Sequence, residues 1–99
     1  MKPRYAGCAK HAMKYYAKHR QETPIFRSPA EKQDWEACDQ AFLAMDSKAQ
    51  ELLLEVYQGR DTFGDNVFNT AKRWSIPQND IWVIVNRFEK QYAQRRGLI

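Results

Sequence analysis

Apolar residues along most of the chain recur every three or four positions, the spacing that places them on one face of an α-helix. Breaks in this pattern coincide with proline, glycine and small polar residues that begin or end helices. No stretch shows the strict alternation that is typical of a half-buried strand. The pattern predicts five helices, which span residues 4–21, 29–45, 48–58, 65–74 and 77–96.

Each predicted helix has one apolar face. The face of the first helix is expected to contain Tyr5, Cys8, Ala12, Tyr15 and His19. The faces expected for the second, third and last helices contain Trp35, Cys38, Phe42 and Met45, then Leu52, Leu53, Val56 and Tyr57, then Ile81, Val85, Phe88 and Tyr92.

Capping signals agree with these boundaries. Ser28 to Glu31 form a capping box with proline at the first helical position. Ser47 is expected to cap the third helix, and Asp65 or Asn66 the fourth, after a loop over residues 60–66.

A chain of 99 residues with 43% hydrophobic side chains has the length and the apolar content of one domain. We therefore expect an all-α fold, a small bundle of about five helices, in a single domain over residues 1–99. Residues 1–21 would form a basic N-terminal helix that can lie at the periphery, and residues 28–97 the remaining helical unit. A two-domain enzyme is excluded by length.

Charge is segregated along the chain, although the formal net charge is only +4. Residues 1–20 contain six bases and no acid, residues 31–55 contain seven acids and two bases, and residues 56–99 contain seven bases and four acids. Basic ends on either side of an acidic middle suit a polyanionic partner, and the acidic block either faces away or contacts another protein. A solvated surface of mixed charge is the alternative explanation.

The C-terminal part carries the spacing of a helix-turn-helix. This motif needs a small residue where its helices touch, a tight turn, and apolar residues on the inner side of the second helix. Ala71 is the small residue, Ser75 is the turn residue between Trp74 and Ile76, and Ile81 and Ile84 supply the inner side. Simple packing of two crossing helices selects similar residues, so this spacing alone leaves both interpretations open.

A longer match surrounds this motif. The run from Phe42 to Tyr57, FLAMDSKAQELLLEVY, resembles the opening of the sigma-factor region-four domain. The interval from Tyr57 to Ala71 is similar to the longer loop of primary sigma factors, and residues 71–81 are in register with the helix-turn-helix of that family. The resemblance covers about residues 35–96. Late-gene regulators of phages of Gram-positive bacteria have a similar layout with an added N-terminal helix.

This resemblance implies a transcriptional regulator, from a phage or mobile element, that binds double-stranded DNA through its last helix and that can contact RNA polymerase. Where the family reads bases with arginine, glutamate and glutamine, this chain has Gln78, Asn79, Trp82 and Val83. Gln78, Asn79 and Asn86 can hydrogen-bond base edges. Trp82 and Val83 cannot do so in the ordinary bidentate way, although Val83 can contact a thymine methyl. The inner position Thr70 departs from the family as well. The expected DNA-binding residues are Gln78, Asn79, Trp82, Val83, Asn86, Lys72, Arg73, Arg87 and Lys90, of which the basic ones contact phosphates.

The competing interpretation is a non-catalytic protein-interaction module that uses the same surface for oligomerisation or polymerase contact. It depends on the apolar run Ile81 to Val85, which is too long for one face of a helix. We expect Trp82 or Val83 to be covered either by the basic N-terminal helix or by a second copy of the chain, as in a homodimer.

Other chemistry has little support in the sequence. Cys8, His11, His19 and Cys38 are zinc-ligand types but lack the paired spacing of structural zinc sites, so no metal is expected and both cysteines are expected to be buried. No phosphate loop, nucleophile elbow or carboxylate pair is present, so we expect neither an enzyme nor a cofactor. The chain has no apolar run long enough for a membrane span or a signal peptide, which favours a cytoplasmic protein with reduced thiols.

Overall fold

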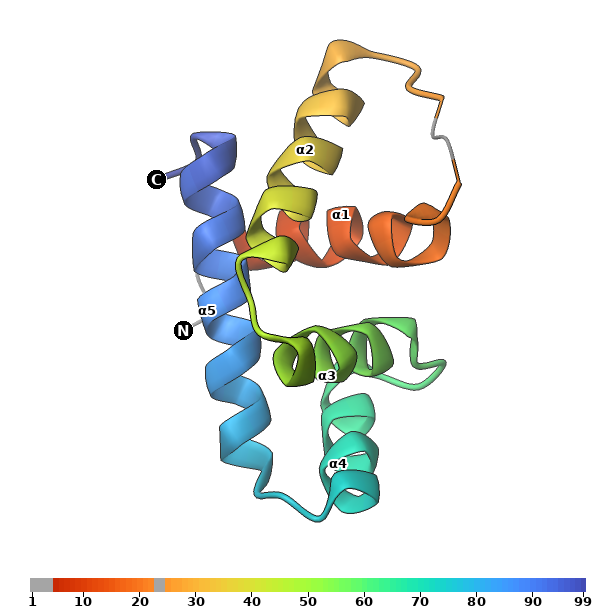
Figure 1. Ribbon diagram of the computed structural model, residues 1–99, viewed down its shortest axis with the longest axis vertical. Helices are drawn as coiled ribbons and strands as arrows, with labels where there is room; N and C mark the ends of the chain where they lie inside the picture. Colours follow the sequence, from red (N-terminus) through yellow and green to blue (C-terminus); the bar gives the residue numbers. More distant parts are fainter. Residues whose placement is uncertain (1–4, 23–24) are drawn as a thin grey trace.

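The computed structural model describes residues 5–22 and 25–99, and all regular structure in these ranges is α-helical. The helices are α1 (Tyr5–His19), α2 (Pro29–Leu43), α3 (Ser47–Gln58), α4 (Phe63–Trp74) and α5 (Gln78–Arg96) (Figure 1). The expected all-α fold of five helices is therefore confirmed for the part of the chain that the structure describes.

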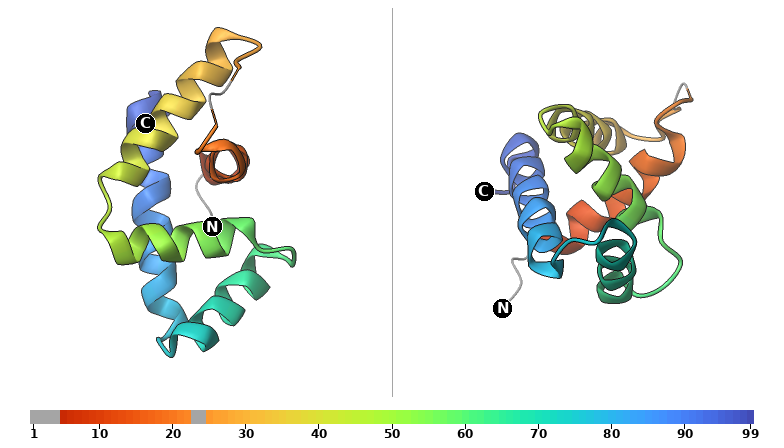
Figure 2. Two further views of the ribbon diagram at one scale, coloured as in Figure 1. Left: turned by 45° about the vertical axis from the view of Figure 1, so that its right-hand side comes forward. Right: turned by 60° about the horizontal axis from the view of Figure 1, so that its bottom comes forward.

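The longest helix, α5, organises the others. It runs along most of the height of the molecule in Figure 1, with α2 beside its C-terminal half and α4 beside its N-terminal end. α1 and α3 lie across it, one above the other, and α1 packs against α2, α3 and α5 (Figure 2). The lower end of the molecule in Figure 1 is therefore formed by α4, the connection after it and the start of α5.

One core unites all five helices. Its largest fully buried side chains come from α1, α2, α3, α4 and α5 alike, so no helix forms a separate unit. The largest fully buried side chains are Met13, Phe42, Leu52, Leu53, Val56, Tyr57, Val67, Thr70, Ile81, Val85, Phe88 and Tyr92. The expected apolar faces of α3 and α5 are confirmed. The face expected for the second helix is buried as well, except for Trp35, which is half-buried.

The first helix belongs to this core and does not lie at its periphery. Its buried residues are Ala6, Ala9, Ala12, Met13, Tyr16 and Ala17. The face predicted from the sequence was wrong by about one position, because small alanines let α1 approach its three neighbours closely. Tyr15 is 41% exposed and lies against His19, with ring centroids 4.6 Å apart.

Polar caps begin three of the helices, two of them from residues other than those expected. The Ser28 hydroxyl accepts from Glu31 N at 3.3 Å, as predicted. Asp46, not Ser47, caps α3, since its Oδ1 accepts from Ala49 N at 2.8 Å. Thr62 caps α4, so this helix begins earlier than predicted and the preceding loop is shorter.

Candidate nucleic-acid interface

A tight turn joins α4 to α5. Ser75 ends α4 in the left-handed conformation, with φ 55° and ψ 43°, a region in which non-glycine residues are uncommon. The backbone N–H of Ile76 donates to the carbonyl of Ala71 at 3.1 Å, which closes the end of α4. Pro77 then precedes α5, whose first helical residue is Gln78. After this sharp change of direction, the first residues of α5, Gln78, Asn79 and Asp80, are exposed.

The outward side of α5 carries amide, apolar and basic residues. Ile81, Val85 and Phe88 are buried on its inner side, whereas Val83, Asn86 and Arg87 between them are exposed. Val83 is 49% exposed. The exposed members of the predicted site on this helix are Gln78, Asn79, Val83, Asn86, Arg87 and Lys90. They lie along the first two-thirds of α5, and we call them together the outer strip of α5.

Trp82 was expected at the interface, and the structure places it at the margin of the outer strip. It is half-buried, and its ring lies against Phe63 at the start of α4, with centroids 5.6 Å apart. Trp82 is therefore partly covered by Phe63 of the same chain, a residue that the sequence analysis did not single out. Phe63 also packs edge-on against Tyr57 of α3, at 5.0 Å between centroids.

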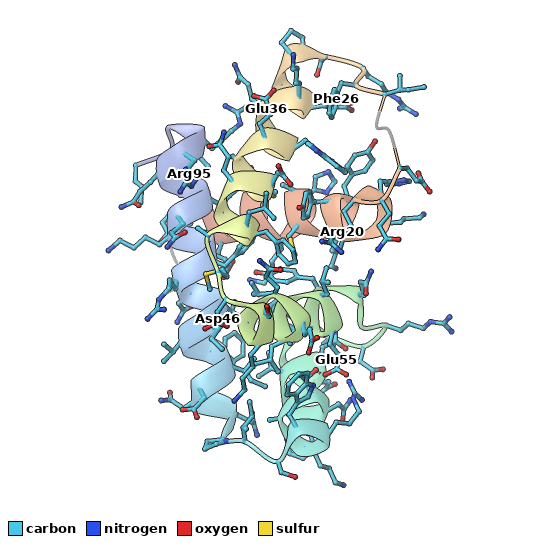
Figure 3. The ribbon with its side chains drawn as sticks, in the orientation of Figure 1. Arg20, Phe26, Glu36, Asp46, Glu55 and Arg95 are labelled. Atoms are coloured by element: carbon cyan, nitrogen blue, oxygen red, sulfur yellow. The ribbon has the colours of Figure 1, made fainter. Side chains whose placement is uncertain are left out.

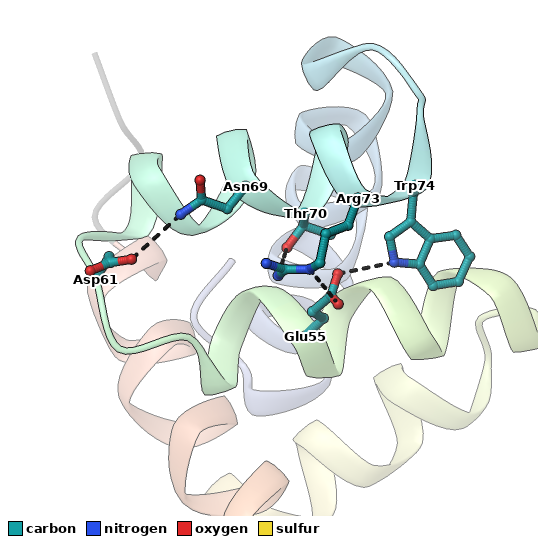
Figure 4. A network of polar contacts seen from close by, with 6 residues as sticks. All are labelled: Glu55, Asp61, Asn69, Thr70, Arg73 and Trp74. Atoms are coloured by element: carbon teal, nitrogen blue, oxygen red, sulfur yellow. Dashed lines mark hydrogen bonds and ion pairs between the residues drawn. The ribbon is translucent and has the colours of Figure 1, made fainter.

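Arg73 was predicted to contact phosphates, but its guanidinium is engaged within the protein. Its Nε donates to Oε1 of Glu55 at 3.0 Å (Figure 4). The indole of Trp74 donates to the other carboxylate oxygen of Glu55 at 3.0 Å. One carboxylate on α3 thus holds the last two residues of α4, whereas Lys72, also exposed at this end of the helix, forms no ion pair with any residue that the structure describes.

The arginines at the end of α5 are also committed to contacts inside the protein. Arg95 donates to Oε1 of Gln40 at 3.3 Å, and Nε of Arg96 donates to Oδ1 of Asp34 at 2.6 Å. This hydrogen bond raises the pKa of Arg96 above its ordinary value. Figure 3 shows Arg95 at the end of the molecule opposite to the start of α5. Arg96 is paired with Asp34, and exposed Arg95 lies away from the start of α5, so the bases beside the exposed amides of this helix are Arg87 and Lys90.

A groove borders the other side of the outer strip. It lies between the start of α3 and the N-terminal half of α5, with a volume of about 440 Å³. Its walls include Asp46 and Lys48 on one side and Asp80, Ile84 and Arg87 on the other. Acidic and basic groups alternate around it, so the groove has no single charge that would select an anion.

The cysteines differ in their surroundings. Cys38 is fully buried as expected, and burial raises the pKa of its thiol. Cys8 is exposed, which corrects the expectation that both are buried. Its helical position faces away from the α1 core because Ala9 and Ala12 occupy the inner side. Among the described residues, no three side chains of histidine, cysteine, aspartate or glutamate gather closely enough to hold a metal ion.

Two residues that shape this region could not be found from local sequence patterns. Glu55 lies 18 positions from Arg73, and Phe63 precedes the predicted start of its helix. Contacts at that separation depend on how α3 crosses α4.

No helix in the described part of the chain has both the length and the apolar character needed to cross a membrane.

Comparison of the chain with protein families, with curated proteins and with solved structures finds no match.

Proposed function

We propose that the protein is a sequence-specific DNA-binding regulator of transcription. In this proposal α4, the turn at Ser75 and α5 act as a helix-turn-helix, and the first half of α5 enters the major groove. The observation that carries it is the outer strip of α5. It presents exposed amide side chains directly after a tight turn, with exposed bases beside them.

The side chains of the outer strip, together with Lys72 of α4, have different roles. Gln78, Asn79 and Asn86 hydrogen-bond base edges, since side-chain amides can both donate and accept there. Val83 contacts a thymine methyl. Lys72, Arg87 and Lys90 bind phosphates and set the position of the protein on the duplex, while Arg73 contributes mainly by holding α4 to Glu55.

The resemblance of residues 35–96 to sigma-factor region four supports the same function and adds RNA polymerase as a second partner. It also supports an origin in a phage or mobile element. Many helix-turn-helix repressors bind as dimers on paired half-sites, so a homodimer on DNA is consistent with the proposal.

A second candidate function is protein binding by the same surface. It is favoured by Val83 in the outer strip, an apolar side chain that is 49% exposed. Exposed apolar side chains of this size occur at protein interfaces. The partner would be a second copy of the chain or a subunit of RNA polymerase.

The decisive experiment selects duplexes from a random pool with the full chain at low salt and then measures affinity by fluorescence anisotropy. Asn79→Ala should cost about 1 to 3 kcal/mol on the selected sequence and little on other duplexes. Gln94→Ala is the matched control, because Gln94 is also an exposed amide on α5 but lies about four turns beyond Asn79. Failure of the wild type to bind any duplex at low salt refutes the proposal.

Salt dependence separates positioning contacts from reading contacts. Arg87→Ala should weaken binding to all duplexes and lower the slope of log affinity against log salt by about one. Lys18→Ala, an exposed base on α1, should leave that slope almost unchanged. Self-association that Val83→Ser abolishes, in a chain that binds no duplex, would instead favour the second candidate.

A further inference from the structure

Lys10 joins α1 to α5 through a buried ion pair. Its Nζ lies 3.7 Å from Oε2 of Glu89, and the two side chains are only 21% and 6% exposed. The ammonium group of Lys10 offsets part of the cost of removing this carboxylate from water. Lys10 is therefore held in place by Glu89, unlike the exposed Lys14 and Lys18 on the same helix.

The same ammonium group also contacts α4. Nζ of Lys10 lies 4.7 Å from the ring centroid of Phe63, within the range of a cation–π interaction. Phe63 in turn lies against Trp82, with the two rings tilted by 31°. A lysine of α1, a phenylalanine of α4 and a tryptophan of α5 thus form one connected series, which we call the Lys10–Phe63–Trp82 stack.

Both contacts of Lys10 lead to the same side of α5. Trp82 and Glu89 are seven residues apart, about two helical turns, so they lie above one another on this helix. Trp82 is also the neighbour of Val83 and lies between Asn79 and Asn86 on the helical surface. The Lys10–Phe63–Trp82 stack therefore contacts α5 at Trp82, next to the outer strip.

We propose that Lys10 is a positioning residue for DNA reading, which fixes Trp82 and the first half of α5 without touching DNA. This inference rests on the proposed function for its consequence, a change in duplex affinity. Its structural content, the placement of Trp82 by Lys10, is independent of DNA. It gives the basic N-terminal helix a role other than binding phosphates.

The test compares two lysines of one helix. Lys10→Met combined with Glu89→Gln removes both charges of this ion pair together. Lys14→Met is the matched control, because it makes the same change at an exposed position of α1. Each protein is measured for thermal unfolding, for the indole N–H signals in ¹⁵N-resolved NMR spectra, with the Trp82 signal assigned from Trp82→Phe, and for duplex affinity at several salt concentrations.

We expect the indole signal of Trp82 to shift in the Lys10 variant and to stay in place in the Lys14 variant. Duplex affinity should fall about tenfold in the Lys10 variant with the salt slope unchanged, as for a residue that acts through others. Lys10→Arg should preserve both readouts, because a guanidinium can keep the ion pair and the contact with the ring.

Phe63→Leu gives a second test that leaves the ion pair intact. It removes the ring between Lys10 and Trp82, so the Trp82 signal should shift in this variant as well. It also keeps the test usable if the Lys10 variant does not fold.

Two results overturn the proposal: a Trp82 signal unmoved in a folded Lys10 or Phe63 variant, or an affinity loss in the Lys10 variant with a salt slope lowered by about one, which identifies a phosphate contact. If the wild type binds no duplex, the proposed function fails, while the Trp82 signal still decides whether Lys10 positions that side chain.

Discussion

Glu55 and Arg73 form an ion pair between α3 and α4, with 3.0 Å between Oε1 of Glu55 and Nε of Arg73. The second oxygen of the carboxylate accepts from the indole of Trp74 (Figure 4). The side chain of Glu55 is 31% exposed, so this carboxylate is partly shielded from water. It fixes the end of α4 immediately before the turn that leads into α5.

We expect Glu55→Gln to destabilise the fold by about 1 to 2 kcal/mol, since it replaces charge-assisted hydrogen bonds by weaker ones at a partly exposed site. Urea unfolding at neutral pH measures this change. Glu51→Gln, an exposed position one turn earlier on α3, is the control and should have almost no effect. Equal effects of the two changes would show that the Glu55 contacts do not stabilise α4.

The Tyr16 hydroxyl donates to Oδ1 of Asp39 at 2.7 Å. Burial, together with this hydrogen bond, raises the pKa of Tyr16 from 10.0 to about 12. The unfolded chain ionises first as pH rises, so stabilisation that is complete below pH 10 is lost between pH 10 and 12.

In Tyr16→Phe, the loss of unfolding free energy between pH 10 and 12 should therefore be smaller than in the wild type by roughly 2 to 3 kcal/mol. This variant also loses one hydrogen bond at neutral pH. Urea unfolding at a series of pH values is the measurement, and Tyr15→Phe at the exposed neighbouring position is the control. An unchanged pH profile in Tyr16→Phe would contradict the prediction. Part of the fall should remain, because burial also raises the pKa of Tyr92.

Two glycines should respond oppositely to replacement by alanine. A Cβ at Gly59 would collide with the side chain of Asn66, which accepts from Asp61 N at 3.2 Å and is itself buried. Gly64 lies in the first turn of α4, and a Cβ there meets nothing within 4 Å.

We expect Gly59→Ala to destabilise the fold by about 1 to 3 kcal/mol, because the loop must shift or break the Asn66 contact. Gly64→Ala should stabilise it by up to about 1 kcal/mol, since alanine loses less backbone entropy in a helix. Thermal unfolding of both variants tests this, and a change of the same sign in both would contradict the assignment.

The two thiols should differ in reactivity with an aromatic disulfide reagent at neutral pH. Cys8 is exposed and should react within the folded protein, whereas Cys38 is fully buried and should react only when the chain opens. The Cys8→Ser variant isolates the slow reaction of Cys38, and its rate should rise steeply with urea. Rapid labelling of Cys38 in Cys8→Ser without denaturant would contradict the packing of α2 in the core.

Periodicity and turn chemistry were sufficient for the number of helices, for most of their ends and for the inner faces of α3 and α5. The reason is that these signals act within a few residues. Leu52, Leu53, Val56 and Tyr57 recur at helical spacing and are all buried, and Gly59 follows where α3 ends. The exposure of Asn79, Asn86 and Arg87 on α5 follows from the same periodicity, since its buried face was assigned correctly.

Only the tertiary structure decided which face of α1 is buried and which charges are free. Tyr5, Cys8 and Tyr15 offered as regular an apolar stripe as the alanines that pack inside, and the choice between them depends on how closely α1 approaches its neighbours. Likewise, Arg73 and Lys72 are equivalent in sequence, but Glu55 reaches only Arg73 because α3 crosses α4 at that point. Lys10 differs from Lys14 for the same reason, because the crossing of α1 and α5 brings Glu89 next to Lys10. Lys10 and Glu89 are too far apart along the chain for any local sequence pattern to predict this contact.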